Sequence, residues 1–266
     1  EGWIGAEAHY IDSGPYMMVS SDLRIDEFKY EGSALGNWEL GGVYLPGEAK
    51  DHHLDAYIRH DGEEIAHLGG IYLPAEEGTG SLSADIAFEH FPLNVANPFV
   101  PDRMVELDGD IDGTLSMKGD PAKPLLNGEL ALDSVTFFMP EMSAMFRFDN
   151  EPVQVVNSKM MFKDFDIFTK GKTPFTINGE VDFSDLERTA VNLKMHAENY
   201  ELLNAPRTKR AMVYGKMYVD FNATLRGPVE ELVMRGNMNI LGKTNVTYVL
   251  KDSPLTVNDR LGDMVT

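Results

Sequence analysis

The sequence predicts an all-β protein, built as an elongated sheet with one continuous apolar face. Residues 217–227 alternate between apolar side chains and polar or amphipathic ones, which is typical of a strand with one dry and one wet face. The same alternation returns along most of the 266 residues, with almost no helical segment between the copies. Glycine, proline, asparagine, aspartate and lysine fall between the copies, where turns require them.

The first 80 residues predict the opening strands of this sheet, although their pattern is less regular than that of residues 81–266. Alternation is weak over residues 1–28, where only a short strand at residues 16–19 is expected. The first clear alternation is at residues 38–44, so a strand is predicted there.

A β-hairpin is predicted in the second part of this region. Residues 54–58 alternate, and Asp61 and Gly62 follow them. Because Asp-Gly between two extended runs is a strong hairpin signal, a return strand is expected over residues 64–73. Residues 76–80 then predict a turn or linker.

A proline-rich stretch separates the two halves of the chain. Residues 81–89 alternate as a strand, whereas residues 91–101 contain three prolines. Proline lacks the backbone donor that a central strand needs. The stretch therefore predicts a loop, or a short helical plug that ends near Pro98, and it is the best candidate for an internal boundary.

The second half is the more regular, and it contains an internal repeat. Residues 109–132 and 215–240 share one order: an alternating strand, a glycine, a turn with proline, then apolar-x-Gly-polar-apolar-x-apolar. Residues 176–183 repeat the second part of it. Repeats without helices predict a stacked β architecture in which each strand contacts only its neighbours. Further strands are expected at residues 144–148, 153–155 and 191–197.

Composition restricts the classes of partner and function. The net charge of −20, from 43 acidic and 23 basic residues, disfavours nucleic acid, because phosphates would be repelled. It disfavours direct adhesion to an acidic lipid surface for the same reason. The absence of cysteine excludes thiol catalysis and disulfides. No apolar run is long enough for a membrane span, and the chain reads as a piece of a longer protein whose targeting or anchoring segment lies elsewhere.

Candidate metal and catalytic motifs are weak. The densest group of possible ligands is His52, His53, His60 and His67, but two of these fall on a strand and in a hairpin turn, so no metal is predicted. A calcium loop imitated by residues 108–113 lacks the glutamate that its twelfth position requires. No nucleophile elbow or phosphate-binding glycine loop occurs, so the sequence predicts no enzyme, no catalytic residue and no cofactor.

The apolar stripe itself has two interpretations. Alternation alone favours the core of an ordinary β-sandwich, in which two sheets bury their apolar faces against each other. Such a fold would suit a carbohydrate-binding or adhesin-type module, although Trp3 and Trp38 are the only tryptophans that a binding cleft could use. A hydrolase on a β-solenoid scaffold and a fragment of a transmembrane barrel would show a similar alternation.

The order of these motifs resembles the TamB branch of the AsmA-like envelope proteins. The resemblance covers about residues 81–266 and is weaker over residues 1–80. It is carried by the glycine-punctuated strands, the proline turns, and the runs of strands that end in apolar-x-Gly-x-apolar, at residues 109–119, 124–132, 159–183, 244–250 and 254–257.

The resemblance implies a fold and a function. Members of this family are anchored in the inner membrane of diderm bacteria and span the periplasm, and their long sheet is bent into a U with an apolar concave groove, the β-taco. They are associated with moving phospholipid toward the outer membrane and with an Omp85-type outer-membrane barrel protein as partner. We therefore expect this chain to be a periplasmic segment that shields acyl chains in an apolar β-groove.

The apolar positions of the regular strands are the candidate groove residues. Several are methionines, whose flexible side chains suit a surface that accepts varied chains. We expect Met217, Val219 and Phe221 to line a trough open to solvent, so that a charge at Val219 would leave the sheet folded. The full set is Leu115, Met117, Leu130, Leu132, Val181, Phe183, Leu193, Met195, Met217, Val219, Phe221, Met234, Met238 and Ile240.

Overall fold

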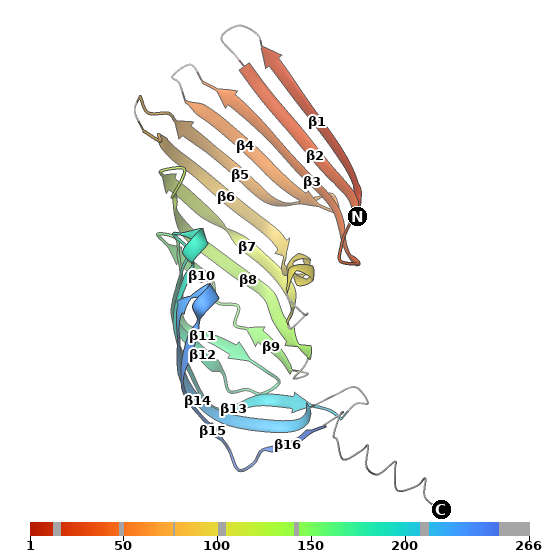
Figure 1. The fold of residues 1–266 in the computed structure, drawn as a ribbon, viewed down its shortest axis with the longest axis vertical. Helices are drawn as coiled ribbons and strands as arrows, with labels where there is room; N and C mark the ends of the chain where they lie inside the picture. Colours follow the sequence, from red (N-terminus) through yellow and green to blue (C-terminus); the bar gives the residue numbers. More distant parts are fainter. Residues whose placement is uncertain are drawn as a thin grey trace, which may run out of the picture.

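The computed structural model describes residues 1–12, 17–47, 51–76, 78–100, 105–140, 144–207 and 213–249, and this part of the chain is all-β (Figure 1). Its 16 strands form a single sheet, and every strand pair is antiparallel. The all-β prediction is confirmed. The described strands are connected in one sheet, and not divided between the two separate sheets that the β-sandwich alternative expects.

The strands are long, and within the described ranges short 3-10 helices join three pairs of them. The strands are β1 (Trp3–Asp12), β2 (Met17–Tyr30), β3 (Ser33–Pro46), β4 (His52–His60), β5 (Glu63–Leu73), β6 (Ser81–Pro92), β7 (Glu106–Gly119), β8 (Leu125–Met139), β9 (Ala144–Phe148), β10 (Val153–Val156), β11 (Lys159–Phe168), β12 (Phe175–Asp182), β13 (Ala190–Ala205), β14 (Val213–Pro228), β15 (Val233–Ile240) and β16 (Asn245–Tyr248). The helices are η1 (Leu93–Phe99), η4 (Leu186–Arg188) and η5 (Val229–Glu231).

The strand order follows the sequence almost throughout. Fourteen strands form one path from β1 to β15, and only β9 and β16 lie off it: β9 pairs with β8 and β11, and β16 pairs with β14. Figure 1 shows β1–β6 as a broad tilted layer, while β13–β16 turn across the opposite end of the molecule. The order agrees with the predicted architecture of neighbour-to-neighbour strands.

Two local predictions about the first half are corrected, and two are confirmed. Residues 1–28 hold most of two long strands, β1 and β2, where only a short one was expected. The proline stretch forms the short helix that was one of its two predicted structures, η1, with Pro98 inside it. It does not interrupt the sheet, however, because β6 continues to Pro92 and pairs with β7 beyond the bulge, with Phe91 opposite Ile111. The predicted hairpin is confirmed, with Asp61 and Gly62 in the turn between β4 and β5.

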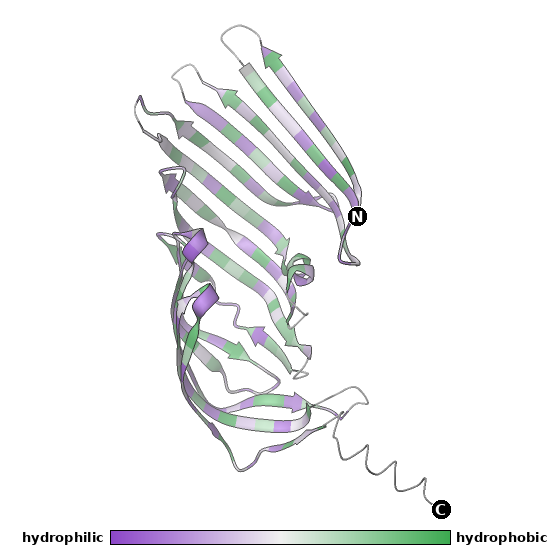
Figure 2. Cartoon of the chain, in the orientation of Figure 1, coloured by the Kyte–Doolittle hydropathy of each residue, from purple (hydrophilic) through white to green (hydrophobic). Residues whose placement is uncertain are grey.

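The register places apolar side chains on one face of the whole sheet, named here the apolar face. Directly opposite residues in an antiparallel pair point to the same side. One such row crosses β3 to β14 and contains Gly42, Ala56, Leu68, Ile86, Leu115, Gly128, Val155, Met160, Val181, Val191 and Gly227. The adjacent row, on the polar face, is polar at every position except Met161, and it runs through Thr114, Glu129, Gln154, Met161, Glu180, Asn192 and Arg226. Figure 2 shows the resulting alternation of hydrophobic and hydrophilic blocks along the strands.

Five β-bulges interrupt the long strands at residues with φ near +50°. Each lies at a register shift, and the bulge residues are Glu27, His90, Ser134, Asp164 and Asn199. In four of them, all but Ser134, the backbone N–H donates to an Asn or Asp side chain on the next strand at 2.7–2.9 Å, and the acceptors are Asn37, Asp112, Asn178 and Asp220. The extra residue bends the strand and resets its alternation.

The buried core lies at one end of the second half. There the apolar residues of β9, β11, β13 and β14 pack together, and Figure 1 shows β9 between β8 and the turned strands. Phe137 stacks on Phe146 with ring centroids 4.4 Å apart. This core cluster consists of Ala144, Phe146, Val153, Phe165, Ile167, Ala197, Tyr200, Leu203, Ala205 and Val219. The apolar face is less covered elsewhere, since Ile4, Leu40 and Leu54 on it are exposed.

Candidate functional site

The histidines of the candidate metal cluster do not converge. The register puts His52 and His60 on the apolar face and His53 and His67 on the polar face. The His67 ring lies between two carboxylates, with Nε2 3.2 Å from Asp55 and Nδ1 3.1 Å from Glu64. Among the described residues, no group of three or more His, Cys, Asp or Glu side chains could hold a metal ion.

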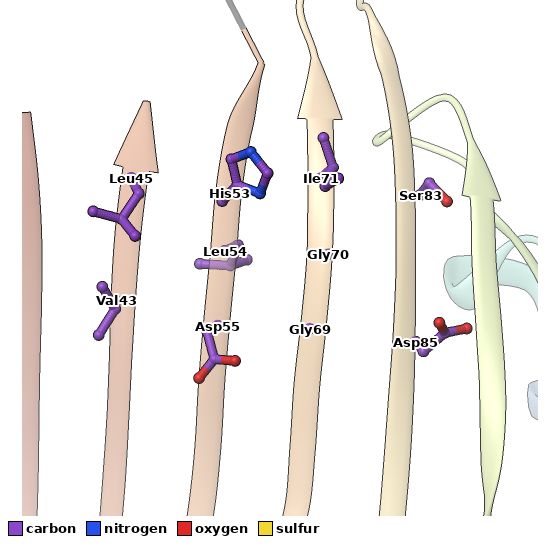
Figure 3. Close-up of a pocket in the computed structure, with 10 residues that line it drawn as sticks. All are labelled: Val43, Leu45, His53, Leu54, Asp55, Gly69, Gly70, Ile71, Ser83 and Asp85. Atoms are coloured by element: carbon purple, nitrogen blue, oxygen red, sulfur yellow. The ribbon is translucent and has the colours of Figure 1, made fainter. Parts of the chain in front are cut away.

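A shallow hollow of about 450 Å³ lies on the polar face of β3–β6 (Figure 3). It forms because Gly69 has no side chain and stands directly between Asp55 and Asp85 in the register. Leu45 and Ile71 line it one row away, beside His53. This mixed lining brings no nucleophile and general base together, so the hollow points to no catalytic chemistry.

The candidate groove residues share the apolar face, but they occupy four environments. Thirteen of them lie in strands, and Phe183 follows the last residue of β12. Met117, Leu130, Val181, Phe183 and Leu193 are half-buried, and Leu115 and Met195 are buried within the sheet. The edge strand β15 exposes Met234, Met238 and Ile240 by 57%, 49% and 60%. The remaining four, Leu132, Met217, Val219 and Phe221, belong to the core cluster or pack against it.

The expectation that Val219 lines an open trough is wrong. Its side chain is 2% exposed, and it lies directly opposite Tyr200, which is also buried. The bulge at Asn199 separates the apolar positions Ala197 and Tyr200 by three residues, and beyond it the sheet encloses its own apolar face. At this end, the stripe is a sealed core.

A second hollow lies on the apolar face, at the strand ends where the β7–β8 turn meets the β12–β13 connection. Its volume is about 510 Å³. The floor is apolar, with Met117, Leu126 and Phe183, whereas Lys123 and Asp185 stand at the rim with Lys123 Nζ 3.8 Å from Asp185 Oδ2. We call this the rim hollow. It was missed by sequence reasoning, because turn residues about 60 positions apart carry no periodic signal.

Ser158 fixes the two walls of the rim hollow. It is 1% exposed, and its hydroxyl donates to the carbonyl of Pro124 at 3.2 Å while accepting from the backbone N–H of Leu126 at 3.0 Å. Its own carbonyl accepts from the N–H of Phe183 at 3.0 Å. The β7–β8 turn and the end of β12 are therefore held in place by one buried residue in the β10–β11 turn.

Another cation near the strand ends is already paired. The ammonium of Lys159 lies 3.0 Å from Glu180 and 3.3 Å from Asp182, and hydrogen bonds to these two carboxylates raise the pKa of Lys159. The pKa of Asp182 is lowered, chiefly because the hydroxyl and backbone N–H of Ser184 donate to it. Lys123 is thus the cation that lines the rim hollow.

The core cluster contains a buried hydroxyl that has no partner among the described residues. Tyr200 is 1% exposed, and no group of the described residues lies within hydrogen-bond geometry of its Oη. The nearby Thr169 hydroxyl donates to the carbonyl of Glu201 at 2.5 Å, and its effect on the pKa of Tyr200 is smaller than that of burial. Burial raises the pKa of Tyr200 to about 12. The folded state therefore resists ionisation of this phenol more than the unfolded state does, whose tyrosine pKa is about 10.

Replacing Tyr200 with phenylalanine is expected to leave the free energy of unfolding at pH 7 unchanged, or to raise it by about 1 kcal/mol. The raised pKa means that the wild-type protein loses free energy of unfolding as the pH rises from about 10, the pKa of the unfolded tyrosine, toward about 12, the pKa of the folded one. The phenylalanine variant has no phenol to ionise, so it should lose less stability than the wild type between these two pH values. Urea titrations at pH 7, 10 and 11 measure both effects. Tyr248→Phe, at an exposed position, is the control, and a destabilised Tyr200→Phe variant at pH 7 would contradict the prediction.

Comparison with known proteins found no matching family model, no matching curated protein and no matching solved structure. Within the described residues, no helix has the length and apolar character of a membrane span. Functional interpretation of the apolar face therefore depends on its own geometry and chemistry.

Proposed function

We propose that this chain is the periplasmic segment of a lipid-transfer and outer-membrane assembly protein of a diderm bacterium. In this proposal, the apolar face shields phospholipid acyl chains as they pass between the inner and outer membranes. The observation that carries the proposal is the continuous apolar row across β3 to β14, much of which lies outside the core cluster.

The chemistry of the face suits an acyl chain. Such a chain needs a dry surface without specific polar contacts, and each methylene removed from water contributes about 0.8 kcal/mol. Exposed or half-buried methionines on the face, Met117, Met234 and Met238, adapt to chains of different length and saturation. Strands about 4.8 Å apart give a chain lying across the sheet a regular series of apolar contacts.

The proposal also includes the bend of the sheet, the membrane anchor and the outer-membrane partner. A sheet bent into a U, the β-taco, would keep the apolar face on its concave side as a groove and place the acidic side chains outside. The repeated strand order that resembles the TamB branch supports this shape, together with an inner-membrane anchor elsewhere in the protein and an Omp85-type barrel as partner. The net charge of −20 is compatible with an apolar face in water, because self-repulsion opposes aggregation.

Leu193→Asp is the variant that tests lipid binding. Leu193 is half-buried on the apolar face, outside the core cluster, so a carboxylate there should leave the sheet folded and reduce co-purified lipid several-fold. Asn192→Asp is the matched control, because it adds the same charge one position away on the polar face. Mass spectrometry of organic extracts measures the lipid, and circular dichroism monitors the fold.

The outcomes separate clearly. Lost lipid in folded Leu193→Asp, with lipid retained in Asn192→Asp, supports the proposal. Met238→Asp, at an exposed position on the same face, provides a second variant if Leu193→Asp does not fold. A wild-type chain that carries no lipid, or folded variants that carry as much as the wild type, would contradict it.

A further inference from the structure

We propose that the rim hollow binds the headgroup of a zwitterionic phospholipid of the phosphatidylethanolamine type, whose acyl chains lie on the apolar face. This inference rests on the proposed function and specifies its ligand. The phosphate would lie beside the ammonium of Lys123, and the headgroup ammonium beside the carboxylates of Asp185 and Glu187, which also line the hollow.

The floor of the rim hollow continues into the apolar face. Met117 and Leu126 are direct register partners, and the next row along the same strands contains Leu115 and Gly128. Phe183 completes the floor from the far side of the β10–β11 turn. A chain that leaves the hollow therefore meets apolar side chains without crossing the polar face, as an amphiphile with a polar end requires.

The charges at the rim complement a ligand that carries both signs. The ion pair between Lys123 and Asp185 is long, at 3.8 Å, and the two side chains are 73% and 46% exposed. An exposed pair of this kind contributes little to stability, so its two members can exchange partners with a ligand at small cost. In the complex, the headgroup phosphate takes the place of the Asp185 carboxylate beside Lys123, and the headgroup ammonium takes the place of the Lys123 ammonium beside Asp185.

The surroundings disfavour a headgroup with a net negative charge. Lys159 lies on the polar face, paired with Glu180 and Asp182, and offers no second cation to the hollow. Asp185 and Glu187, which line the hollow, would face an anionic headgroup directly. The net charge of −20 adds a repulsive field. Because Ser158 holds both walls of the hollow, little ordering remains to oppose binding.

The test uses the purified chain and mixed vesicles of phosphatidylethanolamine and phosphatidylglycerol in equal amounts. After separation from the vesicles, bound lipid is extracted and the ratio of the two lipids is measured by mass spectrometry. The wild type should enrich phosphatidylethanolamine by up to about fivefold, the ratio that corresponds to one exposed ion pair. Asp185→Lys should shift the ratio toward phosphatidylglycerol without reducing total lipid.

Two further variants sharpen the test. The double variant Lys123→Asp with Asp185→Lys keeps one charge of each sign at the rim, so it should retain the wild-type ratio. Lys118→Asp changes a lysine of β7 on the polar face and is the control, which should also leave the ratio unchanged.

The outcomes distinguish this inference from the proposed function. Equal binding of both lipids by the wild type, or an unchanged ratio in Asp185→Lys, would overturn the headgroup assignment and leave lipid binding by the apolar face standing. A wild type that takes up neither lipid would overturn both. A shifted ratio in Asp185→Lys that the double variant restores supports the assignment.

Discussion

Replacing Val219 with aspartate is expected to unfold the C-terminal part of the sheet, whereas the same change at Ile240 leaves the protein folded. The two residues are directly opposite each other on β14 and β15 and point to the same face. Val219 is 2% exposed in the core cluster, and Ile240 is 60% exposed on the edge strand. Position in the sheet, and not position in the pattern, decides the effect.

The expected difference is large. Val219→Asp loses the burial of an aliphatic side chain and leaves a carboxylate in the core without a partner, a combined cost of more than about 4 kcal/mol. That is comparable to the whole stability of many domains, about 5–15 kcal/mol. Urea titrations followed by circular dichroism compare the two variants, and equal midpoints for both would refute the sealed core at this end of the sheet.

Gly179→Ala is expected to lower the free energy of unfolding by about 3 kcal/mol or more, because two penalties act together. Gly179 has φ +135°, a conformation that side chains disfavour, and a Cβ there would lie 2.1 Å from the carbonyl oxygen of Asn192 on β13. The neighbouring strand would have to move. Thermal unfolding of the variant measures the effect as a lower melting temperature.

The control for Gly179 is Gly69→Ala. Gly69 also lies inside a strand, but its nearest atom to an added Cβ is His67 Nε2 at 3.9 Å, and its φ is not in the left-handed region. Alanine there should be neutral or slightly stabilising, because it reduces the freedom of the unfolded chain. Similar losses in both variants would show that the close approach at Gly179 is not what requires glycine.

This close approach also explains the glycine of the sequence repeat. An added Cβ at Gly128, Gly215 or Gly236 would likewise meet a neighbouring carbonyl oxygen at 2.1–2.2 Å. The glycines of the repeat therefore mark positions where a carbonyl oxygen of the adjacent strand lies too close to leave room for a side chain. Periodicity alone could locate these glycines in strands, but it could not show what they contact, because the partner oxygen belongs to the next strand.

The sequence predicted the sidedness of the sheet well, because alternation is a local property of each strand. Leu115 and Val191 were placed on one face by parity within their own segments, and the register confirms this across the strands between them. β1 was missed for a local reason too, and so was the part of β2 that follows residue 19. β1 carries the small Ala6 and Ala8 on its apolar face and Trp3 on the other, so the contrast between faces is low.

What the sequence could not show was where the sheet closes and where turns meet. The bulge at Asn199 changes the spacing of apolar residues from two to three, and nothing in the alternation itself indicates that Val219 then becomes buried. The rim hollow depends on Lys123 and Asp185, whose two turns are tied to the β10–β11 turn by the hydrogen bonds of Ser158 to Pro124, Leu126 and Phe183. These are contacts between turns, and turns lack the hydrophobic periodicity from which the strands were predicted.

The single path of strands has a mechanical consequence. Each of the fourteen strands from β1 to β15 is hydrogen-bonded to its immediate neighbours, so the energy of the sheet is close to a sum of links in a chain. Strand pairs near β1 can therefore unpair one after another, starting from the edge, without disturbing the pairs around the core cluster. A sheet of this kind is lengthened by adding strands at its edge. Its apolar area then increases in proportion to the number of strands, and the packing of the existing strands does not have to change.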